Sequence, residues 1–293
     1  MPETPPRRGL VIVRCGRETL HPFWLQGDTS AWDLHLCPYQ AGEADWPAVR
    51  PGHKWDGLHA HLTEDQRWRN YDYIWLPDDD LACDSDTITR FFEACRRYDA
   101  AIAAPALSED SHWSIALTMR NRNFATRAVS YIEVMAPCFR RDVLEQMLPT
   151  FTLSHRGAGW GIDYLWAKRL GREGLFVFDS LPVRHTRPIL KARNEALHDE
   201  LYRELQRFWE RHDIRPVQRT ARAWDAAGVL HEANHGAFLW RYVQGYAYMI
   251  EKWPWMLMVL VRAQTQELRL PRTPGQRFRQ RLRRLLRRPD RRA

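Results

Sequence analysis

Three consecutive aspartates, Asp78 to Asp80, directly follow residues 71–76 (YDYIWL), whose apolar and aromatic content is typical of a buried strand. Side chains alternate along an extended chain, so Asp78 and Asp80 are expected to point to one side. Two hard oxygen ligands together suit Mn²⁺ or Mg²⁺, and such a cation would bind a diphosphate. The alternative is an acidic turn that caps the next helix, but Asp84 and Ser85 already supply caps there. We therefore predict a metal site.

A glycine-rich segment at residues 158–164 (AGWGIDY) is the second candidate. Gly159 and Gly161 permit a tight turn and close approach of the backbone to a ligand. The indole of Trp160 between them suits stacking on a sugar. Asp163 follows in the first turn of a predicted helix, where it is either a functional carboxylate or a helix cap.

The third candidate is His185 in residues 183–188 (VRHTRP), again after a predicted strand. Neutral imidazole is an acceptable ligand for Mn²⁺. A lone histidine is more often structural, so His185 is a candidate ligand only in combination with the aspartate segment and the glycine-rich segment.

The elements that must position these residues begin as alternating strands and helices. Strands are predicted at residues 10–14, 32–37, 71–76 and 100–104, with helices at 55–68 and 84–98. This alternation indicates a mostly parallel sheet covered on both faces. In such sheets ligands bind beyond the carboxyl ends of the strands, which is where the three aspartates fall.

The later part of the chain follows another pattern. We expect a long strand at 128–138, a short helix at 141–147, a helix from the glycine-rich turn to about residue 170, and a strand at 175–178 followed by an extended piece at 182–185. Residues 191–270 are expected to be helical, with leucines spaced by four at 197, 201 and 205.

The charge of the chain is concentrated at its C-terminus. The net charge is +8, but residues 271–293 hold ten arginines and one aspartate and therefore carry +9, which leaves −1 for the rest. A near-neutral body argues against a specific nucleic-acid-binding domain. Five cysteines without a CxxC pair argue against a disulfide framework or a zinc ribbon and favour the cytoplasm.

The cationic tail has an amphipathic pattern. In a helix, Phe278, Leu282, Leu285 and Leu286 would share one side with arginines around them, which predicts peripheral attachment to an anionic inner membrane surface. The alternatives are a disordered tail or nonspecific nucleic-acid binding. The longest apolar run near this end, residues 253–261, is far shorter than the roughly 20 residues that a spanning helix needs.

The three candidate segments, in this order, resemble nucleotide-sugar-dependent glycosyltransferases of the GT-A fold. The chain is more closely similar to an uncharacterised family, domain of unknown function 707. The segments that carry this resemblance cover most of residues 9–190: LVIVRCG (10–16), LHPFWL (20–25), HKWDGL (53–58), YDYIWLPDDDL (71–81), YIEVMAP (131–137), GWGIDYLW (159–166) and VRHTRP (183–188).

The resemblance implies a GT-A-like, Rossmann-like α/β domain at residues 1–190. Beyond it, the leucine spacing predicts a helical extension at 191–270, and the arginine content defines the basic tail at 271–293. The resemblance also implies roles for individual residues. The donor nucleotide-sugar would be bound by Arg14, Tyr39, Lys54, Asp56, Asp78 and Asp79, the acceptor glycan or glycolipid by Glu133 and Trp160, and Mn²⁺ or Mg²⁺ by Asp78, Asp80 and His185.

Asp163 is expected to be the catalytic base if the reaction inverts the anomeric carbon, and an acceptor-binding residue if it retains the configuration. Two other classes of function stay open from sequence. One is a metal-dependent nucleotidyl or phosphoryl transferase that uses the same aspartates. The other is a non-catalytic binding protein tethered to an anionic surface by its tail.

Overall fold

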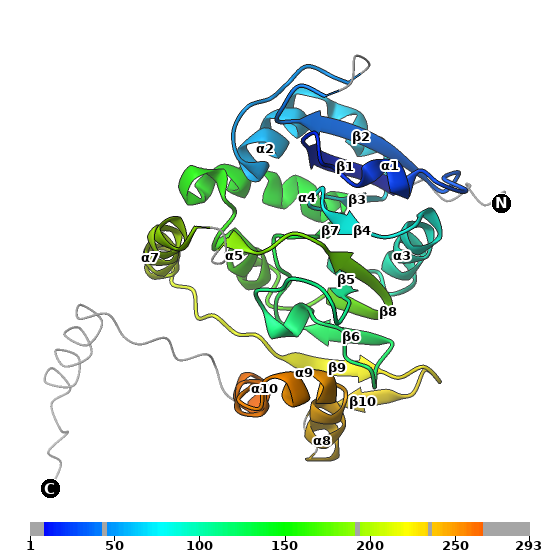
Figure 1. Cartoon of the computed structure of the whole chain (residues 1–293), viewed down its shortest axis with the longest axis vertical. Helices are drawn as coiled ribbons and strands as arrows, with labels where there is room; N and C mark the ends of the chain where they lie inside the picture. The colour runs from blue at the N-terminus through cyan, green and yellow to red at the C-terminus, as the bar shows by residue number, and fades with distance from the viewer. Residues whose placement is uncertain (1–8, 43–45, 191–193, 234–235, 266–293) are drawn as a thin grey trace, which may run out of the picture.

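The computed structural model describes residues 9–42, 46–190, 194–233 and 236–265, and one sheet runs along its length (Figure 1). The strands follow each other across the sheet in the order β10 (Leu230–Glu232), β9 (Thr220–Trp224), β6 (Thr126–Val129), β8 (Leu175–His185), β5 (Ile102–Leu107), β7 (Cys138–Arg140), β3 (Tyr73–Trp75), β1 (Gly9–Cys15) and β2 (Trp32–Pro38). A short strand, β4 (Leu81–Ala82), pairs with β8 outside this path.

Most of these strands share one direction. The pairing places β1, β2, β3, β5, β8 and β9 parallel in direction, with β6, β7 and β10 running against them. The predicted α/β class with a mostly parallel central sheet is therefore confirmed.

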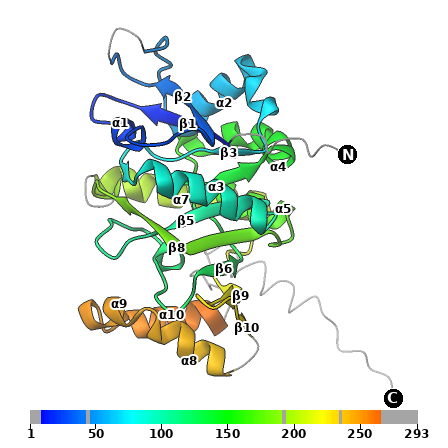
Figure 2. The ribbon, with the colours of Figure 1, turned by 90° about the vertical axis from the view of Figure 1, so that its right-hand side faces the viewer.

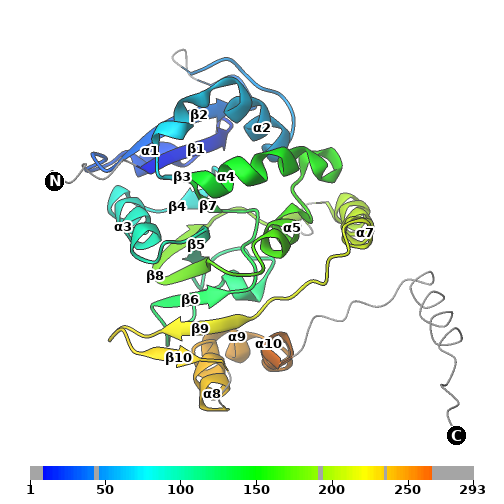
Figure 3. The same ribbon diagram turned by 180° about the vertical axis from the view of Figure 1, so that it is seen from behind.

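Helices cover both faces of the sheet (Figures 2 and 3). One face is covered by α2 (Lys54–Glu64), α4 (Arg141–Met147), α5 (Ile162–Arg169) and α7 (Glu195–Arg211). The other is covered by α1 (His21–Trp24), α3 (Ser85–Arg97), α8 (Gly236–Gln244), α9 (Ala247–Lys252) and α10 (Met256–Thr265). Four short 3₁₀ helices complete the list: η1 (Gln66–Asn70), η2 (Ala116–Thr118), η3 (Leu148–Leu153) and η4 (His155–Gly157).

Two apolar cores result, one on each face. In β1, Leu10 and Ile12 pack into the core that contains α2, whereas Val11 and Val13 pack into the core that contains Phe91 of α3. Both sets of side chains are fully buried, which is why this strand reads as a continuous apolar run.

Helix α3 forms as its sequence predicts. Asp84 is the N-cap, and its carboxylate accepts a hydrogen bond from the Thr87 backbone N–H at 2.8 Å. Ile88, Phe91 and Cys95 lie on its buried face. The cap also confirms that the aspartates at 78–80 are not needed to start this helix.

The long strand predicted at residues 128–138 is wrong. Strand β6 ends at Val129 and β7 begins at Cys138, and these two strands lie on opposite sides of β8 and β5. The chain between them crosses the sheet, and Tyr131 and Ile132 pack into the same core as Ala104 of β5. Apolar side chains that cover a sheet give the same sequence signal as a buried strand.

The helical prediction for residues 191–270 is wrong between 214 and 232, where no residue is helical. Strands β9 and β10 form an antiparallel hairpin there, and β9 extends the central sheet by pairing with β6. Gly228, with φ +79°, lies in the connecting turn and was the available signal. The division of the chain at residue 190 stays a prediction, and the tail at 271–293 lies outside the described residues.

Two further expectations concern cysteines and membrane spans. All five cysteines are free thiols. Among the helices of the described residues, none combines the length and apolar character needed to cross a bilayer.

Candidate functional site

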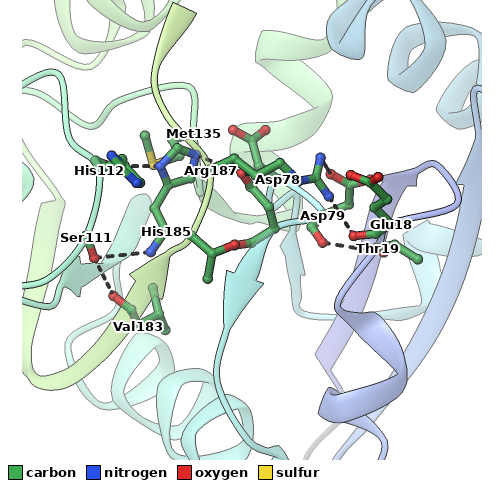
Figure 4. A network of polar contacts seen from close by, with 12 residues as sticks. Glu18, Thr19, Asp78, Asp79, Ser111, His112, Met135, Val183, His185 and Arg187 are labelled. Atoms are coloured by element: carbon green, nitrogen blue, oxygen red, sulfur yellow. Dashed lines mark hydrogen bonds and ion pairs between the residues drawn. The ribbon is translucent and has the colours of Figure 1, made fainter. Parts of the chain in front are cut away.

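The carboxyl ends of β1, β2, β3 and β8 meet at one edge of the sheet, because these strands run in the same direction. The segments that follow them carry the candidate residues of the sequence. The pairing of β4 with β8 sets Leu81 opposite His185 and so brings Asp80 beside that histidine. Figure 4 shows the resulting group of polar side chains.

Asp78 and Asp80 each face a cationic partner. The Asp78 Oδ1 atom accepts a hydrogen bond from Lys54 Nζ at 2.7 Å. The Asp80 Oδ2 atom lies 3.2 Å from His185 Nε2. Asp80 is buried, which alone would raise its pKa, but the hydrogen bond and charge of His185 lower the pKa overall.

Asp79 binds the ends of three other segments. Its carboxylate accepts hydrogen bonds from the Gly16 backbone N–H at 2.9 Å, the Tyr39 hydroxyl at 3.3 Å and Arg187 Nη1 at 3.1 Å. Burial raises the pKa of Asp79, and the Gly16 N–H and Arg187 oppose this shift. Asp79 therefore holds the loops after β1 and β2 against the segment after β8.

The ring of His185 is oriented by its other nitrogen. Nδ1 lies 2.8 Å from the His112 carbonyl oxygen, which can only accept, so Nδ1 carries a proton and donates it (Figure 4). This leaves Nε2 directed at Asp80. Burial disfavours the charged ring, but the hydrogen bond and charge of Asp80 outweigh it and raise the pKa of His185.

Asp78, Asp80 and His185 fit a divalent cation. One ligand atom from each lies within 4.8 Å of the others. The set offers two carboxylates and an imidazole whose Nδ1–H is fixed by a backbone carbonyl, which is the usual outer-shell support of a metal-binding histidine. The three residues that the sequence placed in a metal site therefore lie together.

The residues assigned to the nucleotide lie at or near this edge, with different surroundings. Lys54 Nζ donates to the Val134 and Met135 carbonyls as well as to Asp78. Arg14 is buried, and its guanidinium donates to the carbonyls of Cys37, Pro38 and Gly52. It thus braces the loop after β2.

Asp56 is exposed on α2, and its carboxylate lies against Gly157, where an added Cβ would come within 2.1 Å of it. No described polar contact joins Asp56 to the three aspartates.

Two further carboxylates are buried: Glu133, in the segment 130–137 that crosses the sheet between β6 and β7, and Asp163, in the first turn of α5. Glu133 is 8% exposed and Asp163 is 4% exposed. Burial, with added repulsion from Asp163 and Asp78, raises the pKa of Glu133 to about 8. Burial likewise raises the pKa of Asp163 to about 7, against the effect of its hydrogen bonds.

The hydrogen bonds of these two carboxylates differ. Asp163 accepts from the Tyr131 hydroxyl at 2.6 Å and from the Tyr164 N–H at 2.9 Å. The Oε2 atom of Glu133 is buried and has no hydrogen-bond partner among the described residues, and the hydroxyl of Thr118, a neighbouring residue, donates instead to the Ile115 carbonyl. A buried acceptor of this kind is costly unless a ligand completes it.

A fully buried ion pair between Arg127 and Asp179 holds the backbone on both sides of Thr118 in place. Arg127 and Asp179 are both 0% exposed and form a two-pronged contact at 2.7 and 2.9 Å. Arg127 also donates to the carbonyls of Leu117 and Met119, the neighbours of Thr118. We expect Asp179→Ala to lower the free energy of unfolding by about 3–5 kcal/mol, because it leaves Arg127 buried without its partner.

Urea unfolding measures this loss. The control is Glu64→Ala, which breaks an exposed ion pair with Arg50 and should cost far less. Equal losses in the two variants would contradict the importance of the buried pair.

The glycine-rich segment turns as predicted, but its glycines approach protein atoms. Gly159 has φ +84° and Gly161 has φ +98°. An added Cβ on Gly159 would lie 2.2 Å from Trp55 Nε1, and one on Gly161 would lie 2.7 Å from Phe208. Close packing against these aromatic rings therefore accounts for both glycines.

Trp160 lines a cavity of about 330 Å³ between this segment and α7. Its other lining residues are Leu153, Ser154, His155, Arg156, Leu201, Glu204, Leu205, Phe208 and Arg211. The cavity thus combines an apolar floor with basic side chains.

Arg187, His112 and Tyr131 are parts of the site that sequence reasoning did not select. Arg187 belongs to the VRHTRP motif, so the signal was present, although only its histidine was used. His112 acts through its backbone carbonyl, which no residue type reveals. Tyr131 was assigned to a strand, and its bond to Asp163 becomes visible only in the fold.

No protein-family model and no curated protein sequence matches the chain. Among solved structures, it is similar to S. aureus TarS at 9% identity and a TM-score of 0.47, over 86% of this chain and 75% of that one. The complex of TarS with UDP matches at 8% identity and 0.45, and the complex with UDP-GlcNAc at 8% and 0.40. These two matches cover 70% and 62% of this chain and 65% and 59% of theirs. Values this low assign no residue and no activity.

Proposed function

We propose that the protein is a metal-dependent glycosyltransferase of the GT-A type, which moves a sugar from a nucleotide-sugar to an acceptor hydroxyl. The observation that carries this proposal is the group of Asp78, Asp80 and His185, within 4.8 Å of one another at the carboxyl edge of the sheet. The order of the sequence motifs is the second support.

The leaving group in such a reaction is a nucleoside diphosphate. Mn²⁺ or Mg²⁺ held by Asp78, Asp80 and His185 would supply Lewis-acid stabilisation of its charge. Lys54 and Arg187 add fixed positive charge beside the same carboxylates. The same two cations support a second candidate function, a metal-independent transferase. Lys54 and Arg187 already pair with Asp78 and Asp79, and they could neutralise the charge of a bound diphosphate without a metal ion.

The acceptor hydroxyl loses its proton as its oxygen bonds to the anomeric carbon and the bond to the diphosphate breaks. We propose that Glu133 takes this proton, because its Oε2 has no partner among the described residues. Asp163, the base expected from sequence, already accepts hydrogen bonds from the Tyr131 hydroxyl and the Tyr164 N–H, one on each carboxylate oxygen. In this scheme Asp163 holds Tyr131 and the start of α5 in place.

A thermal-shift screen tests the donor site. Nucleoside diphosphates and nucleotide-sugars are added to the chelator-treated protein with and without Mn²⁺. A ligand at a hundredfold excess over its Kd stabilises by about 2.7 kcal/mol. Stabilisation that requires Mn²⁺ supports the first candidate, equal stabilisation in chelator supports the metal-free one, and no stabilisation by any donor contradicts both.

We also propose that the protein works at an anionic membrane surface. Helix α10 has Arg262 as its only charged residue, and Trp255, Leu257 and Met258 are exposed at its start, Met258 by 69%. Trp240 on the neighbouring helix α8 is 66% exposed. We propose that these exposed apolar side chains form one interaction surface, since a contiguous patch of this kind marks a binding site.

A bilayer is the partner that fits this face. Tryptophan and aliphatic side chains favour the membrane interface, and cations favour anionic lipid. The sequence places the ten arginines of residues 271–293 shortly after α10. A membrane-bound enzyme of this kind would suit a lipid-linked acceptor.

Replacing Trp255 and Met258 with serine should weaken binding to phosphatidylserine vesicles at least tenfold, since each side chain contributes about 1.5–3 kcal/mol when buried. Sedimentation with vesicles measures the effect. The control is Val229→Ser, another exposed apolar residue, on the turn between β9 and β10. Unchanged vesicle binding of the double variant would contradict membrane docking by this face. So would a wild-type protein that forms a stable dimer when the double variant is monomeric.

A further inference from the structure

A second group of metal-binding side chains lies outside the aspartate site. His35 of β2, His61 of α2 and Asp65 at the start of η1 each offer one ligand atom, and these atoms lie within 4.8 Å of one another. His61 is seven residues beyond Lys54 along α2, or about 10 Å. The group is therefore separate from the aspartates to which Lys54 belongs.

The two imidazoles have donor atoms available. His61 Nε2 is buried and has no hydrogen-bond partner among the described residues. His35 contacts the rings of His61 and Tyr71 edge-on, and neither of its nitrogens has a described hydrogen bond.

Asp65 is already held in a fixed orientation. Its carboxylate accepts from the Arg67 backbone N–H at 3.0 Å and from the Arg67 guanidinium at 2.7 to 3.1 Å. Ligating carboxylates commonly carry such outer hydrogen bonds, which orient them toward the metal. Each carboxylate oxygen accepts more than one bond, so the contact with Arg67 leaves capacity for a cation.

We propose that His35, His61 and Asp65 bind a divalent transition-metal ion, Zn²⁺ by preference. Two imidazoles and one carboxylate match the nitrogen and oxygen ligands of Zn²⁺. Mg²⁺ and Ca²⁺ prefer sites made wholly of oxygen, which this group is not. The chemistry thus differs from that of the aspartate site, where two carboxylates meet a single histidine.

Such an ion would clamp the edge of the sheet. Strand β2 is the last strand on its side and pairs only with β1 within the described sheet. A metal bound by all three residues would add a second connection, from β2 to α2 and to the turn that follows it. Because β2 leads into Tyr39 and α2 begins at Lys54, this clamp would steady two segments that reach the proposed donor site.

The test is a titration of the tag-free, chelator-treated full chain with Co²⁺, followed by its visible absorption, and then with Zn²⁺ as competitor. The aspartate site is disabled by Asp80→Asn with His185→Asn, and this background should still bind one equivalent of Co²⁺ that Zn²⁺ displaces. Adding His35→Gln and His61→Gln should abolish the signal.

Asp65→Asn is the milder variant, because asparagine keeps the cap on the Arg67 N–H. It should weaken Zn²⁺ binding at least tenfold. If the histidine variants do not fold, Asp65→Asn still tests the proposal. Loss of Co²⁺ binding in the Asp80→Asn, His185→Asn background while the fold is retained, or unchanged binding in Asp65→Asn, would overturn the proposal. Neither outcome bears on glycosyl transfer, which the other site carries.

Discussion

Replacing Asp78 and Asp80 together with alanine is expected to abolish Mn²⁺-dependent binding of a nucleoside diphosphate while the protein stays folded. Both carboxylates belong to the group that His185 completes. Without them a single imidazole remains, which does not hold Mn²⁺ at neutral pH, and the charge that organises the diphosphate is lost. Calorimetric titration with and without Mn²⁺ measures the change.

The matched control is Asp86→Ala. Asp86 is an exposed carboxylate in the first turn of α3, paired loosely with Arg90 at 3.5 Å and remote from the site in contacts. It should bind the nucleotide with wild-type affinity. Equal affinity in the Asp78 and Asp80 double variant would rule out the metal site as the origin of nucleotide binding.

Glu133→Gln should lower sugar transfer by about 10² to 10⁴, the usual contribution of a general base, with donor and metal binding retained. The amide preserves the shape of the side chain but cannot accept the proton. Steady-state transfer rates at saturating donor and acceptor measure the loss.

The pH dependence gives an independent check. A base must be deprotonated to act, and the pKa of Glu133 is raised to about 8 by burial and by the neighbouring Asp163. Transfer should therefore rise about tenfold per pH unit below pH 8 and level off above it. The apparent pKa belongs to the Glu133 and Asp163 pair, because the two carboxylates interact.

Asp163→Asn separates the two carboxylates. If Asp163 only positions Tyr131 and α5, this variant should lose much less activity than Glu133→Gln. Its transfer rate should still rise with pH and level off near pH 8. A loss confined to Asp163→Asn, with normal turnover in Glu133→Gln, would return the base role to Asp163.

Local sequence patterns were sufficient for the first half of the fold. Strand β1, the amphipathic α3 and its Asp84 cap follow from burial periodicity and capping chemistry, which act over a few residues. The strand predicted over the crossing segment at 130–137 was wrong, because apolar residues give the same sequence pattern whether they pair in a sheet or cover it. Strands β9 and β10 were not predicted, because they depend on the pairing of β9 with β6, which is far away in the sequence.

The candidate site was predictable in its residue types and less so in its partners. Asp78 follows β3 and His185 ends β8, two strands of the same direction, and the pairing of β4 with β8 brings Asp80 beside His185. The hydrogen bonds of Arg14 with backbone carbonyls and that of Asp163 with the Tyr131 hydroxyl depend on segments far away in the sequence. The burial of Glu133 Oε2, without a hydrogen-bond partner in the part of the chain that the structure describes, is likewise a property of the packed structure.

The central claim is transfer chemistry at the nucleotide-sugar, and product analysis tests it most directly. The protein is incubated with Mn²⁺ and a panel of nucleotide-sugars, and the products are separated with and without an acceptor. The account predicts a nucleoside diphosphate together with free or transferred sugar, formed by the wild type and not by the Asp78 and Asp80 double variant. A sugar phosphate with a nucleoside monophosphate, or no turnover of any donor, would contradict it.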